Sequence, residues 1–291
     1  MLRAATRGSP LARWQADHIA SLLAGVDVEP VVVTTAGDRD RTSPLTEIGG
    51  KGVFVKEVQA AVLDGRADFA VHSAKDLPSE TPEGLIIAVV PERADPRDAL
   101  VGRSLAELTP GSTVATGSAR RQSQLAAHRA DLAFVGLRGN MDTRLAAARQ
   151  HGAVVVAFAA LQRLGRAGEA AEVLDPSIVL PQVGQGTLAV ECRVDDEETR
   201  SLLAAIDHEP SHRTLRAERA FLDELGGDCT LPAGAYAQVD GEGVTIEGMV
   251  AALDGSVVLR HSVAGTDPEA AGRAVARHLL DDAGGSAILS P

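Results

Sequence analysis

The chain has 291 residues, enough for two or three domains of about 100–200 residues each. Hydrophobic residues make up 45% of it and charged residues 23%, an ordinary globular composition that excludes wholesale disorder. The formal net charge of −12 and an aromatic content of 2% argue against a nucleic-acid binder, which needs a basic surface and stacking platforms.

The sequence also lacks the signals of a membrane or secreted protein. No apolar run approaches the ~20 residues that span a bilayer, and the first residues show no signal-type cleavage site. The two cysteines, Cys192 and Cys229, are too few for a disulfide framework. We therefore expect a soluble cytoplasmic protein without a membrane partner, whose thiols are free unless its chemistry uses one.

Short apolar runs alternate with helical patterns in the first part of the chain. Ser9 is a preferred helix N-cap and Pro10 suits the first helical turn, so a helix is expected to begin there. A second helix is expected from Gly52 onward. Strands are expected over residues 2–6, 26–35, 67–72 and 85–90. The polar stretch 39–52 ends in glycines and is expected to form a lid.

The same alternation restarts near Asp95. Strands are expected over residues 112–116, 132–137 and 153–158, and helices over 118–128 and 142–150. Such β/α alternation predicts mainly parallel sheets covered by helices. Two units of similar size predict two lobes with a cleft between them.

The last third of the chain has a different pattern. The pairs Asp240-Gly241 and Asp254-Gly255 lie between β-rich runs, which is typical of hairpins. Asp267 and Pro268 then open an amphipathic helix. These signals predict a small α+β domain.

Two familiar strings are better explained as ordinary structure. Residues 208–212, HEPSH, match the zinc-protease pattern HExxH, but Pro210 blocks the continuous helix that this pattern needs. We expect Pro210 to begin a new helix, and we expect no metal site. Residues 184–189, GQGTLA, match a dinucleotide-binding pattern only loosely, because they follow two β/α units and an interrupting Pro181. A crossover between lobes explains these glycines as well.

Two other stretches place polar residues where α/β proteins bind ligands. Residues 49–57, GGKGVFVKE, put glycines before a helix, whose free N–H groups favour an anion, although a plain flexible loop is the alternative. In residues 71–78, VHSAKDLP, polar groups follow a strand, and ligands of open sheets bind at the carboxyl ends of strands. The alternative there is an exposed ion pair of Lys75 and Asp76, which contributes little.

Arginines and one cysteine complete the set of candidate residues. Arg120 and Arg121 begin a predicted helix, where a cation opposes the helix dipole, and that cost indicates a bound anion. Because arginine also grips carboxylates with two hydrogen bonds, we expect a polyanionic ligand in the cleft. Cys229 follows two glycines in a loop and is available for chemistry, whereas Cys192 lies in an apolar run and is expected to pack in the core.

Eight motifs follow one another along the chain: ATRGSPLARWQA, GGKGVFVKE, ADFAVHSAKDLP, DPRDAL, TGSARRQSQL, LRGNMDTRL, LPQVGQGTLAVECR and GGDCTLPAGAYA. Together they resemble, over essentially the full length, the hydroxymethylbilane synthase family, also called porphobilinogen deaminase. The resemblance implies an α/β fold with two lobes like those of type II periplasmic binding proteins, chain crossovers between them, and a small C-terminal α+β domain. The implied boundaries are residues 1–92 with 187–206 for domain 1, 97–181 for domain 2 and 209–291 for domain 3.

The resemblance also implies the reaction. Family members join four porphobilinogen molecules head to tail with loss of ammonia, and water then releases the linear tetrapyrrole hydroxymethylbilane. The chain grows on a dipyrromethane cofactor, which the motif match places on Cys229 through a thioether. A monomer is expected, with porphobilinogen as its small-molecule partner and no nucleic acid.

The resemblance further assigns roles to individual residues. Asp76 matches the catalytic aspartate, a buried acid that stabilises positive charge on the pyrrole and passes a proton to the departing amine. The cofactor-binding positions are Lys51, Lys75, Ser118, Arg120, Arg121 and Arg144, besides Cys229. The substrate-binding positions are Arg7, Ser9, Phe54, Arg138 and Arg163, with Phe54 close to the substrate pyrrole.

Three positions depart from the family pattern, one of them Ala119, which stands where leucine is usual. Glu47 stands where many members carry lysine, which puts a carboxylate contact from this position in doubt. Gly117 stands where serine is usual, and its extra backbone freedom is expected to loosen the anion site.

Two competing classes stay open from the sequence. One is a two-lobed binding protein for polycarboxylates that has lost catalysis, against which Asp76 and Cys229 argue together. The other is a cysteine-nucleophile hydrolase, which lacks a recognisable base.

Overall fold

The computed structural model describes residues 1–39, 52, 54–226 and 231–289. The chain forms two compact units: Met1–Ala94 with Thr187–His212, and Asp95–Gly186 with Arg213–Pro291. They are called the first and second units below. The predicted lid lies outside the described residues except at its two ends. The three-domain boundaries, which separate 97–181 from 209–291 within the second unit, stay a prediction.

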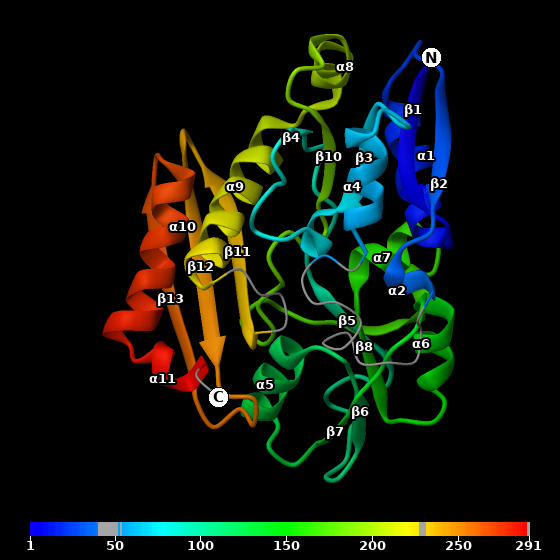
Figure 1. Cartoon of the computed structure of the whole chain (residues 1–291). Helices are drawn as coiled ribbons and strands as arrows, with labels where there is room; N and C mark the ends of the chain where they lie inside the picture. Colours follow the sequence, from blue (N-terminus) through cyan, green and yellow to red (C-terminus); the bar gives the residue numbers. More distant parts are fainter. Residues whose placement is uncertain (40–51, 53, 227–230, 290–291) are drawn as a thin grey trace. The chain divides into compact units, whose positions relative to one another are not determined.

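The first unit contains a five-stranded sheet in the order β2-β1-β3-β10-β4 (Figure 1). Its strands are β1 (Leu2–Arg7), β2 (Val28–Val33), β3 (Phe69–Ser73), β4 (Leu85–Val89) and β10 (Leu188–Arg193). Strand β1 is parallel to β2 and β3, whereas β10 is antiparallel to both of its neighbours. Because β4 is antiparallel to β10, it runs in the same direction as β1, β2 and β3, so the sheet is mainly parallel as expected. Strand β10 is the exception, because it joins the sheet from a crossover rather than from a βαβ unit.

Helices cover both faces of this sheet. Leu2 of β1 shares a core cluster with Ile19 of α1 (Pro10–Leu22), while Ala5 of the same strand shares another with Val58 of α4 (Lys56–Leu63). Alternate side chains of a strand point to opposite faces, so the sheet is buried on both sides. The remaining helical segments are α2 (Ala36–Arg39), η1 (Ala74–Asp76), α8 (Glu197–Leu203) and η3 (Ala204–Ile206).

The second unit repeats this topology in a sheet of the order β7-β6-β8-β5-β9. Its strands are β5 (Asp98–Gly102), β6 (Thr113–Ala115), β7 (Ala133–Val135), β8 (Ala153–Ala157) and β9 (Ala170–Val173), and its helices are α5 (Ala119–His128), α6 (Met141–Ala147), α7 (Phe158–Arg163) and η2 (Ala167–Glu169). Strands β6, β7 and β8 are parallel and β5 is antiparallel to its neighbours. The fourth strand in each of these two orders, β10 in the first sheet and β5 in the second, is the strand that follows a crossover of the chain from one unit to the other. These two strands are called the crossover strands. Two α/β lobes of one topology, linked by crossovers, confirm the predicted fold class.

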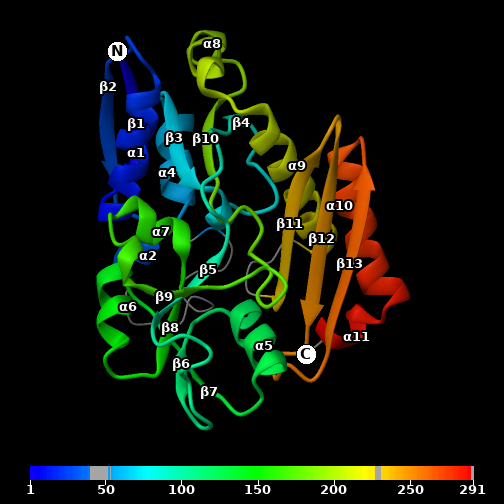
Figure 2. The same cartoon turned by 180° about the vertical axis from the view of Figure 1, so that it is seen from behind.

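A three-stranded antiparallel sheet forms the C-terminal part of the second unit. Its elements are α9 (Glu209–Glu224), β11 (Ala233–Asp240), β12 (Gly243–Ala251), β13 (Val258–Gly265), α10 (Pro268–Arg277), η4 (His278–Asp282) and α11 (Gly285–Leu289). Helix α10 lies along one face of the sheet in both views (Figures 1 and 2), where Val275 packs with Phe221 and Ile246. The two predicted hairpins are confirmed, and Pro210 lies in the first turn of α9 as predicted. Within the described ranges, no helix is both long and apolar enough to cross a membrane.

Candidate functional site

Asp76 lies at the carboxyl end of β3, where the short turn η1 (Ala74–Asp76) follows the strand. The turn is fixed by the backbone, because the Ala74 N–H donates to the Thr187 carbonyl at 3.0 Å, just before β10. The side chain of Asp76 is exposed and that of Lys75 is partly exposed. The expectation of a buried acid is therefore wrong, because Asp76 is on the outer side of a turn whose Ala74 and Leu77 are buried.

A buried polar group anchors the strand that leads to Asp76. Glu191 of β10 is 1% exposed and accepts hydrogen bonds at 3.2 and 2.9 Å from the side-chain amide of Gln59 on α4. The Nε2 atom of His72 lies 3.1 Å from Glu191 Oε2. Sequence reasoning missed Glu191, which reads as one polar residue in an apolar strand, although burial of such a residue requires partners.

Arg7 and Phe54 meet in the first unit. The guanidinium carbon of Arg7, at the end of β1, lies 4.2 Å from the centroid of the Phe54 ring, within the range of a cation–π contact. Ser9 caps α1 as predicted, since its hydroxyl accepts from the Ala12 N–H at 3.2 Å. Lys51 and Glu47 lie outside the described residues.

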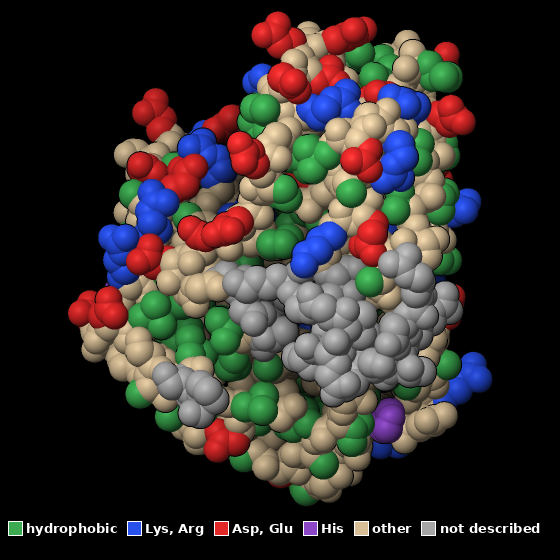
Figure 3. Space-filling model, viewed as in Figure 1, with side chains coloured by type: hydrophobic (Ala, Val, Ile, Leu, Met, Phe, Trp, Pro, Cys, Tyr) green, Lys and Arg blue, Asp and Glu red, His purple; other side chains and the backbone are tan. Residues whose placement is uncertain are grey.

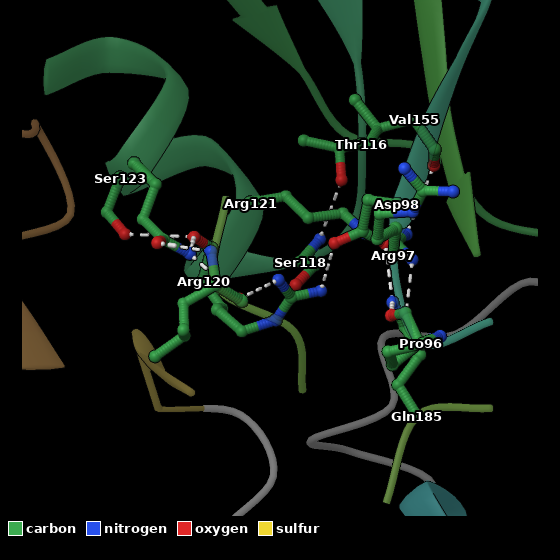
Figure 4. Close-up of polar contacts among 12 residues, drawn as sticks. Pro96, Arg97, Asp98, Thr116, Ser118, Arg120, Arg121, Ser123, Val155 and Gln185 are labelled. Atoms are coloured by element: carbon green, nitrogen blue, oxygen red, sulfur yellow. Dashed lines mark hydrogen bonds and ion pairs between the residues drawn. The ribbon is translucent and has the colours of Figure 1, made fainter. Parts of the chain in front are cut away.

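Arg120 and Arg121 converge on Asp98 in the second unit (Figure 4). Arg120 Nη2 donates to Asp98 Oδ2 at 2.8 Å, and Arg121 Nη2 lies 2.7 Å from Asp98 Oδ1. The Nη1 atom of each arginine donates to a backbone carbonyl. Arg120 Nη1 lies 2.6 Å from the Leu180 oxygen, and Arg121 Nη1 lies 3.1 Å from the Val155 oxygen. This group ties α5 to β5, β8 and the segment before the crossover.

The charges of this group do not balance. Asp98 is 0% exposed, Arg120 2% and Arg121 5%, so one buried carboxylate faces two buried guanidiniums. Burial alone would raise the pKa of Asp98, but the charges of Arg120 and Arg121 outweigh it and hold that pKa well below its usual range. Burial and the neighbouring Arg121 lower the pKa of Arg120. In the described part of the chain, Arg120 Nε is buried without a hydrogen-bond partner. An excess positive charge and an unused donor are what an anion would satisfy.

Gln185 links this group to the crossover. Its side-chain amide donates to Asp98 Oδ1 at 2.9 Å and to the Pro96 carbonyl at 2.7 Å. The neighbouring Gly184 N–H donates at 2.7 Å to Glu218 of α9, which also accepts from the Ala237 N–H of β11 at 2.9 Å. The sequence signalled the crossover through its glycines, but gave no sign of Asp98, Gln185 or Glu218 as partners.

The other predicted arginines differ in their surroundings. Arg163 is 9% exposed, donates from Nη2 to the Gly186 carbonyl at 2.7 Å, and has its pKa lowered to about 10 by burial. Arg144 Nε donates to the Gly139 carbonyl at 3.0 Å. Arg138 is only partly exposed, and its Nη1 atom is buried without a hydrogen-bond partner in the described structure.

Gly117 is required by close packing rather than by backbone freedom. A Cβ at this position would lie 2.6 Å from the Leu137 carbonyl oxygen, and Gly117 does not have a positive φ. The glycine lets the carbonyl of Leu137, which follows β7, approach the backbone beside Ser118, whose N–H donates to Thr116 Oγ1 at 3.2 Å. The expectation that Gly117 loosens the anion site stays a prediction.

The two cysteines differ as far as the structure describes them. Cys192 is fully buried, as predicted, and burial raises the pKa of its thiol to about 11. Cys229 lies outside the described residues. Gly234 of β11 lies next to the arginine group, because a Cβ on it would lie 2.6 Å from the Pro181 carbonyl and 2.9 Å from Arg120 Cδ.

The predicted site residues that the structure describes divide between the two units, and within them it shows contact between Arg7 and Phe54 and, through Asp98, between Arg120 and Arg121. Arg7, Ser9, Phe54, Lys75 and Asp76 belong to the first unit, and Ser118, Arg120, Arg121, Arg138, Arg144 and Arg163 belong to the second. The cleft between the lobes stays a prediction.

Comparison with known proteins decides the family. The sequence matches the family described as porphobilinogen deaminase, dipyromethane cofactor binding domain, over residues 2–201, and the corresponding C-terminal domain over residues 212–281. The porphobilinogen deaminase of Nitratidesulfovibrio vulgaris (strain Miyazaki F) is 45% identical over 300 residues, covering 98% of this chain and 95% of that protein. That of Roseiflexus sp. (strain RS-1) is 46% identical over 295 residues, covering 98% and 97%. This chain belongs to the porphobilinogen deaminase family.

Porphobilinogen deaminases are transferases, and the matched domain binds a dipyrromethane cofactor. The described residues fit such a polycarboxylate, since the arginine group has a surplus positive charge and an unused buried donor on Arg120. Among solved structures, the L-cystine solute receptor of Neisseria gonorrhoeae in its unliganded open conformation shares 15% identity, with a TM-score of 0.40 over 79% of this chain and 94% of that one.

Proposed function

We propose that this porphobilinogen deaminase joins four porphobilinogen molecules head to tail, with loss of ammonia at each step, and releases hydroxymethylbilane by hydrolysis. The observation that carries the proposal is the buried arginine group, in which Arg120 and Arg121 are paired, among the described residues, with the single carboxylate of Asp98. Porphobilinogen carries an acetate and a propionate, so each added unit brings two carboxylates to be bound.

The proposal assigns Cys229 as the attachment residue for the cofactor. When bound, the dipyrromethane supplies the terminal pyrrole carbon at which the chain of substrate units grows. Its carboxylates would be held by Lys51, Lys75, Ser118, Arg120, Arg121 and Arg144. Attachment requires a thiol, because a serine hydroxyl is a much weaker nucleophile.

The substrate is assigned to a second set of residues. Arg7, Arg138 and Arg163 would bind its carboxylates, which arginine grips with paired N–H donors. Ser9 offers a hydroxyl, and the Phe54 ring offers a flat apolar face to the pyrrole.

Asp76 is proposed as the catalytic residue. Its position one turn beyond β3 leaves the carboxylate exposed and therefore accessible to a substrate. A carboxylate beside the pyrrole N–H stabilises the positive charge that develops as ammonia leaves. The same group can deliver a proton to the departing amine and take one up again.

We further propose that the protein acts as a cytoplasmic monomer without nucleic-acid partners. In the upper part of the face shown in Figure 3, acidic and basic side chains are intermixed over the described surface. This pattern and the net charge of −12 disfavour a phosphate backbone as a ligand. Light scattering coupled to size-exclusion chromatography measures the oligomeric state.

Intact mass spectrometry with a turnover assay tests the proposal. The purified protein should exceed its sequence mass by two condensed pyrrole units on one cysteine, and should convert porphobilinogen to a product that gives porphyrin absorbance after acidification and oxidation. A protein that binds porphobilinogen without added mass or product would be the two-lobed binding protein instead.

A further inference from the structure

Phe54 is enclosed on two sides in the first unit. The guanidinium carbon of Arg7 lies 4.2 Å from the ring centroid. A Cβ built on Gly37 would lie 2.1 Å from Cε1, 2.6 Å from Cδ1 and 2.8 Å from Cζ of the same ring. Real Cβ atoms do not approach so closely, so only a glycine lets the ring occupy this place.

The backbone that carries Gly37 is tied to the helix that follows Phe54. Gly37 lies in α2, and the N–H of the preceding Ala36 donates to Glu57 Oε1 at 2.7 Å. Glu57 lies in the first turn of α4, three residues after Phe54. The neighbouring Val55 is 1% exposed, which fixes the start of α4 in the core. The segment bearing Gly37 and the segment bearing Phe54 are therefore held against each other.

We propose that Gly37 is a positioning residue that seats the Phe54 ring under Arg7 for contact with the substrate pyrrole. The inference rests on the proposed function, which gives Phe54 and Arg7 their substrate-binding roles. A methyl group at position 37 would push the ring away and separate it from the guanidinium. Because a binding contact of this kind is present in both the ground state and the transition state, its loss should raise KM and leave kcat nearly unchanged.

The test is a double-mutant cycle with Gly37→Ala and Phe54→Ala, and with Gly168→Ala as the matched control. No heavy atom lies within 4 Å of a Cβ on Gly168, and its φ is not positive. Gly37→Ala should raise KM for porphobilinogen about ten-fold, with kcat within two-fold, and Gly168→Ala should change neither. In the Phe54→Ala background the effect of Gly37→Ala should fall below two-fold, because no ring remains to be displaced. An unchanged KM in Gly37→Ala, or an equal effect in both backgrounds, would overturn the proposal.

A second measurement does not depend on turnover. In protein labelled with 4-fluorophenylalanine, the resonance of Phe54 is identified by its disappearance in Phe54→Leu. Gly37→Ala should shift this resonance alone among the five phenylalanines of the chain. If the wild type proves inactive while the resonance shifts in Gly37→Ala, Gly37 does position the Phe54 ring and the proposed function fails. If the wild type is active and the resonance does not shift, the positioning role of Gly37 is refuted.

Discussion

Substitution of Asp98 by asparagine should strongly destabilise the second unit. The change keeps the size of the side chain but removes the carboxylate that faces Arg120 and Arg121, at 2.8 and 2.7 Å. Both guanidiniums stay buried, so their desolvation is no longer offset. The amide also presents an N–H₂ group to donors, because Arg120, Arg121 and Gln185 all donate to Asp98.

Removing one partner of a buried ion pair costs about 3–5 kcal/mol. With an m value of about 3 kcal/mol/M in urea, this lowers the unfolding midpoint by roughly 1–1.7 M. Equilibrium unfolding followed by circular dichroism measures the shift. The matched control is Asp131→Asn, which removes the partner of Arg129 in a more exposed pair and should leave the midpoint almost unchanged. Equal midpoints for the two variants would refute the structural role of the buried group.

Three further predictions concern catalysis, cofactor attachment and the dependence of stability on pH. Asp76→Asn should fold normally by circular dichroism, yet lose activity by at least about 100-fold, the scale of a preorganised electrostatic group; product formation within a few-fold of wild type would remove Asp76 from the mechanism. Cys229→Ser should lack the cofactor mass, whereas Cys192→Ser should retain it; a normal mass in Cys229→Ser would contradict the assignment. The pKa of Asp98 is lowered on folding, so its stabilisation is present above about pH 4 and is lost as the pH falls further. Unfolding free energy should therefore depend less on pH below 4 in Asp98→Asn than in the wild type, and equal slopes would count against this.

Much of the fold was predictable because its signals are local. The cap and first turn at Ser9 and Pro10, the hairpin glycines at 241 and 255, and the helix after Asp267 each depend on neighbouring residues alone. The direction of β10 was not predictable in this way. A strand sequence specifies which residues are buried, but its pairing depends on where a crossover delivers it.

The buried partners of the site were not predictable for the same reason. Asp98 lies 22 residues before Arg120 in sequence, within the charged motif DPRDAL. Only the pairing of β5 with β8 places it beneath the start of α5. Arg120 and Arg121 were found because arginines at a helix start conflict with the helix dipole, whereas nothing local marks the carboxylate that offsets them.

The crossover strands also set the order in which the protein matures during synthesis. Strand β4 joins the first sheet through β10, which follows it in the chain only after the whole of residues 95–186. Until the ribosome has delivered Arg193, the edge of β3 that β10 covers is open, and β4 has no place in the sheet. An open strand edge pairs readily with another chain. A nascent chain that stalls before residue 188 therefore offers an aggregation-prone edge, which stays open until β10 has been made.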